Sequence, residues 1–529
     1  MARRLLTGEC HIWHSVSRLK SSQLMRCRVT LTLSLVLLSS LATSQVAAAQ
    51  ELTTAELVRV EDWYRRTVER TGDGEWGIAI GAMNGRVLWS LNPELELIPA
   101  STAKLFTIGF TRARAGGGAR ISTRLIGRGT LDSTTGRWIG SWQLELGGDP
   151  TLERAGRAGP SLRELARQLH DRGIRVLEGP LALTSRTGPA LSRYPAVWSA
   201  DFIGRLYAPP VGPVTLHENT ISLTVRPGRD VGSPLMVVSA YPAGVDRMVR
   251  MSATTVGGNR RRLTLAADPD GGWTLGGTLG IYARPAGISA VAHEPASVLG
   301  YAWAAALERV GISWINRTSP PPVWQGLPAV LAKVESAPFD SVAVEINRRS
   351  LNIGAELVLQ WAAASQTAGP SLLTQHVRQV VGPRAQVHLV DGSGLSDLDR
   401  VSPLTQMLYL ARYPQLRGAE RYPLLLPANG IGSLRSLRRG MARGVVHAKT
   451  GTLDRVATLA GYLGRPDGVL VISLMYNGRR THAARAAEWE LFQLLGAEGV
   501  NLSGALDTHM GGSSSPVDEL AEDSAQVLR

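Results

Sequence analysis

Apolar and polar residues recur along this chain with two spacings, one typical of strands and one typical of helices. Residues 76–82 and 86–90 alternate with a period of two on either side of an Asn-Gly turn, which predicts a β-hairpin. Residues 51–69 before the hairpin carry apolar positions at helical spacing. Residues 101–113 after it do the same and begin with Ser and Thr, as a helix N-terminus should. The first part of the chain therefore predicts a helix, a hairpin and a second helix.

The pattern changes in residues 119–324, where short apolar runs are separated by Gly, Pro and Asp turns. The predicted strands there are 138–146, 175–183, 220–226, 235–240 and 262–266. A helix is predicted over residues 297–310. Because β-rich stretches of this kind rarely continue an αβ pattern, we expect residues 119–324 to form one or two inserted domains.

Helical patterns resume after the insertion, so residues 50–118 and 325–504 are expected to form one domain of mixed α/β (α+β) class. Helices are predicted over residues 341–366, 403–413 and 482–495. Strands are predicted over residues 445–450, 457–463 and 469–476. The last residues, 505–529, are rich in Gly, Ser and acids, and we expect them to be disordered.

The N-terminal residues 1–49 have the composition of a secretory signal peptide. Basic residues precede an apolar run over residues 29–42, and three alanines at 47–49 offer a cleavage site. A complete signal already follows Met25, so we expect translation to start there; an uncleaved anchor is the alternative. Both cysteines, Cys10 and Cys27, lie in this segment. The exported chain would need no disulfide in an oxidising compartment.

Charge excludes one class of partner. The formal net charge is +14, but the arginines are spread singly apart from short clusters at residues 260–262 and 435–443. No basic patch is interleaved with aromatic residues, so we expect no nucleic-acid partner. Peripheral association with a membrane surface or with anionic wall polymers stays open, because both would attract a cationic protein.

Lysine is nearly absent from the chain, and its placement indicates chemistry. After residue 50 the only lysines are Lys104, Lys333 and Lys449. A buried ammonium can lose its proton and act as a base, whereas a guanidinium cannot. Ser101 lies three residues before Lys104 at a predicted helix start, so the two side chains share a face. A neutral Lys104 could then activate the Ser101 hydroxyl as a nucleophile. Lys333 has no motif around it.

A second short motif, Ser-Leu-Asn, starts at Ser350. Ser350 could relay a proton to a leaving group, while Asn352 could hold Lys104 and a substrate amide. The structural alternative for this motif is a helix cap.

A third motif starts at Lys449 on a predicted strand. Lys449 and Thr450 could bind a carboxylate, and Gly451 would allow close approach of a substrate backbone. The backbone N–H groups of Ser101 and Thr452 could form an oxyanion hole. An ordinary edge-strand lysine is the alternative for this motif.

The ordered triplet S-x-x-K, S-x-N and K-T-G resembles the D-alanyl-D-alanine carboxypeptidase/endopeptidase family, the class C low-molecular-mass penicillin-binding proteins. Residues 97–101 (Leu-Ile-Pro-Ala-Ser), 147–152 (Gly-Gly-Asp-Pro-Thr-Leu) and 391–396 (Asp-Gly-Ser-Gly-Leu-Ser) add to the resemblance. Trp198 and Asp201 resemble a Trp and an acid that relatives place in the inserted domain, where the acid meets a substrate amine.

The resemblance implies an antiparallel sheet flanked by helices, of the serine β-lactamase/DD-peptidase kind, with β-rich domains inserted after the nucleophile helix. It also implies a periplasmic serine peptidase that acts on peptidoglycan stem peptides through an acyl-enzyme on Ser101. Ser101, Lys104 and Ser350 would be catalytic, and Asn352 and residues 449–452 would bind substrate. β-Lactam antibiotics would bind at the same site, and neither a metal nor a cofactor is expected. The alternatives are a β-lactamase and a non-catalytic wall-binding scaffold.

Overall fold

The chain is described here by a computed structural model that covers residues 51–156, 159–316, 327–437 and 440–510. The predicted signal peptide, residues 1–49, lies outside the described residues. Among the described residues, no helix combines the length and the apolar character needed to cross a membrane.

A five-stranded antiparallel sheet carries the first and last parts of the chain. Its order is β18-β19-β20-β1-β2, so the N-terminal hairpin pairs with the C-terminal strands. The strands are β1 (Glu75–Ala82), β2 (Val87–Leu91), β18 (Val446–Leu453), β19 (Val456–Arg465) and β20 (Gly468–Asn477). β19 and β20 are buried along nearly their whole length, because helices cover both faces of the sheet.

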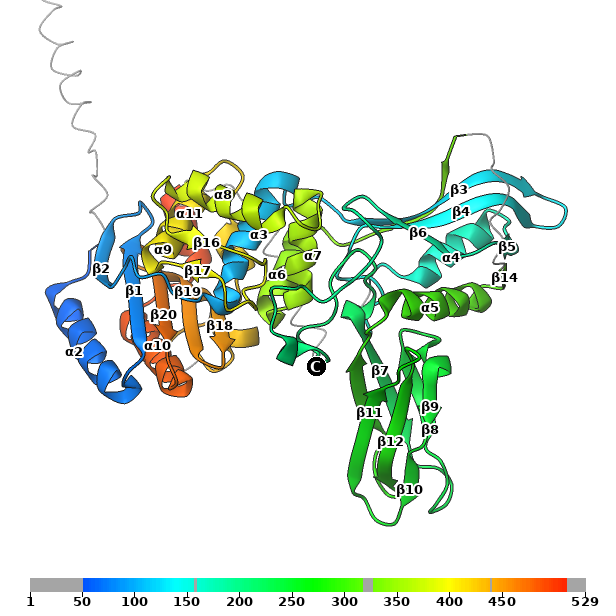
Figure 1. Cartoon of the computed structure of the whole chain (residues 1–529). Helices are drawn as coiled ribbons and strands as arrows, with labels where there is room; N and C mark the ends of the chain where they lie inside the picture. Colours follow the sequence, from blue (N-terminus) through cyan, green and yellow to red (C-terminus); the bar gives the residue numbers. More distant parts are fainter. Residues whose placement is uncertain (1–50, 157–158, 317–326, 438–439, 511–529) are drawn as a thin grey trace, which may run out of the picture. The chain divides into compact units, whose positions relative to one another are not determined.

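Two groups of helices cover the two faces of this sheet (Figure 1). One face packs against α2 (Thr54–Thr71) and α10 (Thr481–Leu495) through a core that includes Trp63, Trp76 and Phe492. The other face packs against α9 (Pro403–Arg412) and α11 (Leu502–Met510). Four further helices share one apolar core with them: α3 (Lys104–Ala115), α6 (Phe339–Arg349), α7 (Asn352–Ala363) and α8 (Gly369–Val381). Two very short strands, β16 (Val387–His388) and β17 (Arg400–Val401), pair beside α8 and α9. The antiparallel sheet flanked by helices confirms the expected fold class.

The inserted segment begins after α3 and contains a second sheet of six strands. Its order is β14-β5-β4-β3-β15, and β6 pairs separately with β4. These strands are β3 (Ser122–Asp132), β4 (Arg137–Leu146), β5 (Val176–Glu178), β6 (Ala182–Ser185), β14 (Ser313–Ile315) and β15 (Ala329–Glu335). Helices α4 (Leu162–Asp171) and α5 (Pro295–Arg309) share one apolar core with this sheet.

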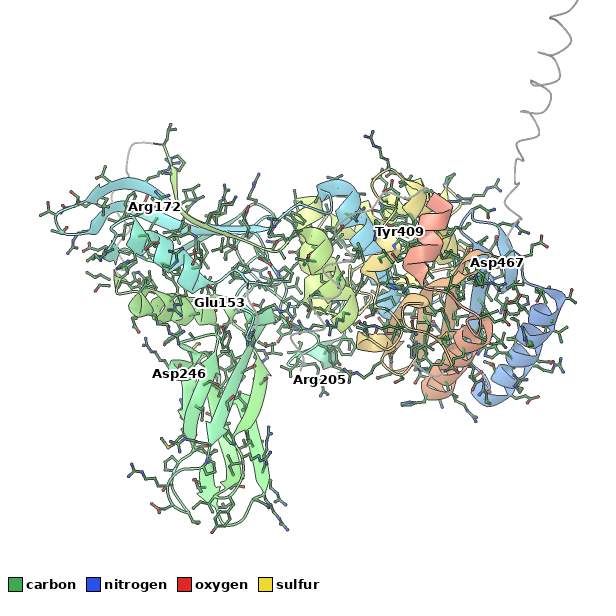
Figure 2. All side chains as sticks on the ribbon, turned by 180° about the vertical axis from the view of Figure 1, so that it is seen from behind. Glu153, Arg172, Arg205, Asp246, Tyr409 and Asp467 are labelled. Carbon is green, nitrogen blue, oxygen red and sulfur yellow. The ribbon has the colours of Figure 1, made fainter. Side chains whose placement is uncertain are left out.

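A smaller β module is nested inside the insertion between α4 and α5 (Figure 1). One of its sheets has the order β13-β7-β8, and the other has the order β10-β12-β11 with β9 also paired to β12. The strands are β7 (Thr220–Arg226), β8 (Met236–Tyr241), β9 (Val249–Met251), β10 (Thr254–Val256), β11 (Arg261–Ala267), β12 (Trp273–Gly280) and β13 (Ala286–Val291). Asp246, labelled in Figure 2, marks the end of this module that meets α5.

Several predicted elements differ from the structure. The predicted helix over residues 341–366 is two helices, α6 and α7, because Ser350 adopts a left-handed conformation with φ of 56°. The predicted strand over residues 175–183 is divided into β5 and β6, since Gly179 and Pro180 interrupt the ladder. Residues 329–335 were expected to belong to the domain of residues 50–118 and 325–504, but they form strand β15, which pairs with β3 of the insertion. The expected disorder from residue 505 is replaced by α11 as far as Met510.

Candidate active site

Ser101 lies in a strained turn at the start of α3. It belongs to a short 3₁₀ helix, η1 (Ala100–Ala103), that runs directly into α3. The preceding Ala100 has a φ of 47°, a conformation that costs free energy for a residue other than glycine. Gly394 packs against this turn, and a Cβ at Gly394 would lie 1.8 Å from the carbonyl oxygen of Ala100. The turn is therefore held by a loop that approaches as closely as only glycine allows.

Lys104 is the first residue of α3, and its side chain is completely buried. Its Nζ lies 2.9 Å from Ser101 Oγ, as the three-residue spacing predicts. The same Nζ lies 2.6 Å from Asn352 Oδ1 and 2.7 Å from the carbonyl oxygen of Ser393. The ammonium nitrogen thus has three fixed partners, and one of them is the candidate nucleophile.

The surroundings of Lys104 bring its pKa close to neutrality. Burial lowers the pKa of the ammonium to about 8, while the nearby carboxyl groups of Asp391, Glu356 and Asp399 oppose that shift. A lysine with a pKa near 8 is partly neutral at physiological pH, so it can accept a proton from a neighbouring hydroxyl.

These three carboxyl groups form a buried acidic cluster that the sequence analysis did not identify. Burial raises the pKa of Glu356 to about 8 and, with Asp391 nearby, raises the pKa of Asp399 well above its usual range. Asp391 instead accepts hydrogen bonds from the backbone N–H groups of residues 393–396. Its carboxylate therefore organises the loop whose Ser393 carbonyl contacts Lys104.

Ser350 and Lys449 form a second serine–lysine pair. Lys449 Nζ lies 2.9 Å from Ser350 Oγ and 2.6 Å from the carbonyl oxygen of Thr450. Lys449 is fully buried, and burial together with the positive charges of Lys104 and Arg485 lowers its pKa well below the usual range. Ser350 also caps a helix: it is the C-cap residue of α6, and its backbone N–H donates to the carbonyl oxygens of Asn347 and Ile346, whereas the N-cap of α7 is Leu351.

Asn352 links the candidate nucleophile pair to the insertion. Its Oδ1 contacts Lys104 Nζ, and its Nδ2 donates to the carbonyl oxygen of Tyr207 at 2.9 Å. Tyr207 belongs to the insertion, in the irregular segment before β7. Both ends of the Asn352 amide are therefore engaged, which fixes the orientation of the oxygen toward Lys104.

The segment of the insertion over residues 194–212 packs on the site at two further points. Trp198 Nε1 donates to Asp391 Oδ2 at 2.9 Å, and Ser396 Oγ donates to the carbonyl oxygen of Val197 at 2.8 Å. Trp198 is buried in an apolar cluster with residues of α7. Asp201, in contrast, is exposed in the same segment.

The packing of β18 against the turn at Ser101 requires glycine at position 451. A Cβ at this position would lie 2.2 Å from Thr458 Oγ1, 2.7 Å from the Pro99 carbonyl oxygen and 2.9 Å from the Ser101 nitrogen. We had expected Gly451 to admit a substrate backbone, but its hydrogen faces the nucleophile turn. The absence of a side chain lets β18 lie against Ser101.

Thr450 and Thr452 continue along β18, with Thr450 partly exposed and Thr452 exposed. Arg485 of α10 supports this part of the strand, since its guanidinium donates to the Gly451 carbonyl and to Thr452 Oγ1. Arg485 also pairs with Glu488, a fully buried residue whose pKa burial raises to about 7. Neither residue belongs to a recognisable motif, so sequence reasoning had no signal for them.

The remaining predictions concern residues apart from this cluster. Lys333 lies in the insertion and forms a surface ion pair with Glu335 at 2.6 Å. In the part of the chain that the structure describes, no group of three or more His, Cys, Asp or Glu side chains is arranged to hold a metal ion.

Comparisons with known proteins identify a family and several relatives. The profile of the D-Ala-D-Ala carboxypeptidase 3 (S13) family matches residues 66–497. A D-alanyl-D-alanine carboxypeptidase of Actinomadura sp. (strain R39) is 26% identical over 438 residues, covering 78% of this chain and 79% of the relative. Penicillin-binding protein 4 of Haemophilus influenzae has a similar fold, with a TM-score of 0.64 and 20% identity over 82% of this chain and 98% of that one. Its structure in complex with a β-lactam gives a TM-score of 0.62.

The match to the family profile extends over most of the chain, from α2 through the insertion to α10. The chain belongs to the D-Ala-D-Ala carboxypeptidase 3 (S13) family, and it is a serine-type peptidase.

Proposed function

We propose that this enzyme cleaves the terminal D-alanyl-D-alanine bond, and the equivalent crosslink, of peptidoglycan stem peptides through an acyl-enzyme on Ser101. The observation that carries the proposal is the 2.9 Å contact between Ser101 Oγ and the buried Lys104 Nζ, whose pKa is lowered to about 8. A scaffold protein would have no need for a lysine in this state.

In the proposed acylation step, Ser101 Oγ attacks the carbonyl carbon of the penultimate D-alanine. Lys104 Nζ accepts the hydroxyl proton as the carbon–oxygen bond forms. The oxyanion would be bound by the backbone N–H groups of Ser101 and Thr452. Ser101 occupies the first turn of η1, where a backbone N–H has no acceptor within the helix.

Breakdown of the tetrahedral intermediate requires a proton on the departing amine. Ser350 Oγ would relay it: the proton that Lys104 took from Ser101 would pass through Ser350 to the amine, which leaves Lys104 neutral again, while Lys449 Nζ, 2.9 Å from Ser350 Oγ, orients the hydroxyl. The carbon–nitrogen bond then breaks and terminal D-alanine leaves. A water molecule, deprotonated by Lys104, hydrolyses the ester and frees Ser101.

The substrate's terminal carboxylate would bind along β18, at Thr450 and Thr452. Burial and neighbouring cations lower the pKa of Lys449, so an arriving carboxylate stabilises its charged form. Asn352 would bind the stem-peptide amide while it holds Lys104. Binding of the substrate carboxylate would therefore raise the pKa of Lys449 and favour its protonated form.

The proposal includes β-lactam binding, because a β-lactam presents a strained amide and a carboxylate in the positions of the D-alanyl-D-alanine terminus. The complex of the Haemophilus influenzae relative with a β-lactam supports it.

Export to the periplasm is also proposed, on the signal-like sequence of residues 1–49. Peripheral association with the wall or the membrane is proposed on the net charge, which is +14 for the whole chain and stays positive, at 14 − 5 = +9, without residues 1–49.

Release of D-alanine from a stem pentapeptide tests the proposal. We expect the wild-type enzyme to release it and the Ser101→Ala variant to lose activity by more than about 10³-fold, the scale for losing a covalent nucleophile. Equal release by the two proteins, or none by either, would overturn the assignment.

A further inference from the structure

The small β module ends in three loops that form one surface. They are the β7–β8 loop, the β10–β11 loop and the β12–β13 loop, and they lie at the end of the module farthest from α5 (Figure 1). Backbone hydrogen bonds connect them: Gly232 donates to Thr255, Ile281 donates to Val256, and Tyr282 donates to Gly258. We call residues 226–235, 256–262 and 280–287 the basic tip.

The basic tip concentrates positive charge. It contains six arginines and a single acidic residue, Asp230; the arginines are Arg226, Arg229, Arg260, Arg261, Arg262 and Arg284. All six are exposed. Within the described parts of the chain none of them forms an ion pair, and Arg261 donates instead to the carbonyl oxygen of Gly287. The charge of the tip is therefore directed at solvent or at a partner.

Large apolar side chains stand among these arginines. Tyr282 is 81% exposed and Val231 is 62% exposed, and both are within two residues of an arginine. The adjoining strand β8 is the free edge of its sheet, and its Met236 and Val238 are 44% and 54% exposed. Four large apolar side chains are thus exposed on or directly beside the tip that carries the six arginines.

We propose that the basic tip binds an anionic phospholipid surface, with the arginines on lipid phosphates and with Tyr282 and Val231 between the headgroups. Charge complementarity supplies long-range attraction, at about 1 kcal/mol for each basic residue near the surface. The apolar residues favour a bilayer over a soluble polyanion, because only a bilayer offers hydrocarbon beneath its phosphates. Tyrosine in particular is enriched at membrane interfaces, where its ring is apolar and its hydroxyl remains hydrated.

Co-sedimentation with vesicles tests this proposal. The probes are vesicles of phosphatidylcholine alone and vesicles containing phosphatidylglycerol at about one third of the lipid. The variants are a charge reversal, Arg260→Glu with Arg284→Glu, and an apolar replacement, Tyr282→Ser with Val231→Ser. A matched control, Arg59→Glu with Arg66→Glu, reverses two exposed arginines on α2. Each protein is prepared without residues 1–49, because the apolar run of the proposed signal peptide would itself bind vesicles, so that residues outside the tip contribute equally.

We expect wild-type binding to depend on phosphatidylglycerol and to weaken with salt. The charge reversal should lower the partition coefficient by at least about 30-fold, the equivalent of about 1 kcal/mol for each of two arginines. The apolar replacement should lower it by roughly 10-fold, and the α2 control should bind nearly as wild type. Penicillin acylation should stay unchanged in every variant, which shows that each is folded.

Three results would overturn the proposal. The first is retained binding in the charge-reversed tip, and the second is an equal loss in the α2 control. The third is wild-type binding by the Tyr282→Ser, Val231→Ser protein together with complete competition by soluble polyphosphate. That third result would assign the tip to an anionic polymer instead.

Discussion

The indole N–H of Trp198 donates to the carboxylate of Asp391 at 2.9 Å, which connects the insertion to the loop beside the candidate base. The same carboxylate accepts backbone N–H groups of that loop, and the loop's Ser393 carbonyl contacts Lys104. Tyr207 makes a second connection through Asn352. The insertion thus supports the position of Lys104 in addition to any contact with substrate.

Replacing Trp198 with Phe should slow acylation while the protein stays folded. The substitution keeps an aromatic ring in the apolar cluster but removes a hydrogen bond to a charged group, which contributes about 1.5–3 kcal/mol. If the loss of this hydrogen bond raises the activation free energy by the same amount, the second-order penicillin acylation rate should fall by roughly 10–100-fold. The measurement is the acylation rate together with the melting temperature.

Trp142→Phe is the matched control for this prediction. Its indole N–H also donates to an oxygen, the Glu178 carbonyl at 2.7 Å, but within the insertion's own sheet. It should lower stability and leave acylation nearly unchanged. If both variants lose only stability, Trp198 has a structural role alone.

Arginine substitutions should separate the two buried lysines. Each lysine lies 2.9 Å from a serine hydroxyl, so distance alone does not identify the base. Lys104→Arg should lower acylation by roughly 10²–10⁴-fold, because a guanidinium cannot accept the Ser101 proton near neutral pH. Lys449→Arg should retain appreciably more activity, since a fixed positive charge still attracts a carboxylate. Acylation rates of both variants provide the measurement.

Lys333→Arg serves as the control and should behave as wild type, because the Lys333 ammonium forms a surface ion pair with Glu335. An active Lys104→Arg enzyme, or equal losses at Lys104 and Lys449, would mean that the base is misassigned.

Acylation should depend on pH through Lys104. Its pKa is about 8, so the neutral fraction grows as pH rises through that value. The acylation rate should therefore increase by about tenfold for each pH unit below 8 and level off above it. A rate that is flat from pH 6 to 9 would be inconsistent with a lysine base of this pKa.

Glu356→Gln should move this pH profile to lower pH. The pKa of Glu356 is also about 8, so near the midpoint of the profile part of Glu356 is ionised, and that charge favours the ammonium form of Lys104; removing it lowers the pKa of the lysine. Glutamine retains an oxygen for the backbone N–H of Gly392, which Glu356 now binds at 2.9 Å. Glu335→Gln, at an exposed ion pair, is the control and should leave the profile in place. A midpoint that rises in Glu356→Gln would contradict the electrostatic assignment.

Gly451→Ala should lower the acylation rate by about 100-fold. The added methyl group would lie 2.9 Å from the Ser101 nitrogen and 2.2 Å from Thr458 Oγ1, so the nucleophile turn or β18 must shift. A displacement of about 1 Å at a reacting group can cost about 100-fold in rate. Gly118→Ala is the control, because a Cβ there meets nothing within 4 Å. Near-normal acylation by Gly451→Ala would show that the turn is more adaptable than its contacts indicate.

The sequence predicted the elements whose pattern is local. The hairpin, the helix after Ser101 and the C-terminal strands follow from periodicity and turn residues. The break between α6 and α7 did not, because the sequence there is helical in composition, whereas Ser350 adopts a left-handed conformation and its hydroxyl contacts Lys449 from a distant strand. Tertiary contacts overrode the local preference at this functional position.

The motif residues were predicted as a cluster because short spacings fix which side chains share a helix face or a strand. Ser101 and Lys104 are the clearest case. Other contacts of the site join segments that are far apart in the sequence, namely those of Asp391 with Trp198 and of Arg485 with Gly451. A single sequence carries no spacing rule that predicts such contacts. The 391–396 segment did give a signal through family resemblance, though without a role for its carboxylate.

Covalent labelling by penicillin tests the central claim most directly. The wild-type enzyme and Ser101→Ala are incubated with fluorescent penicillin, measured by intact mass, and digested to locate the adduct. The account predicts one penicilloyl group per wild-type chain, on the peptide containing Ser101, and no adduct on Ser101→Ala. The adduct should persist, whereas rapid multiple turnover would indicate a β-lactamase. Equal labelling of the two proteins, or an adduct on Ser350, would contradict the assignment of Ser101 as the nucleophile.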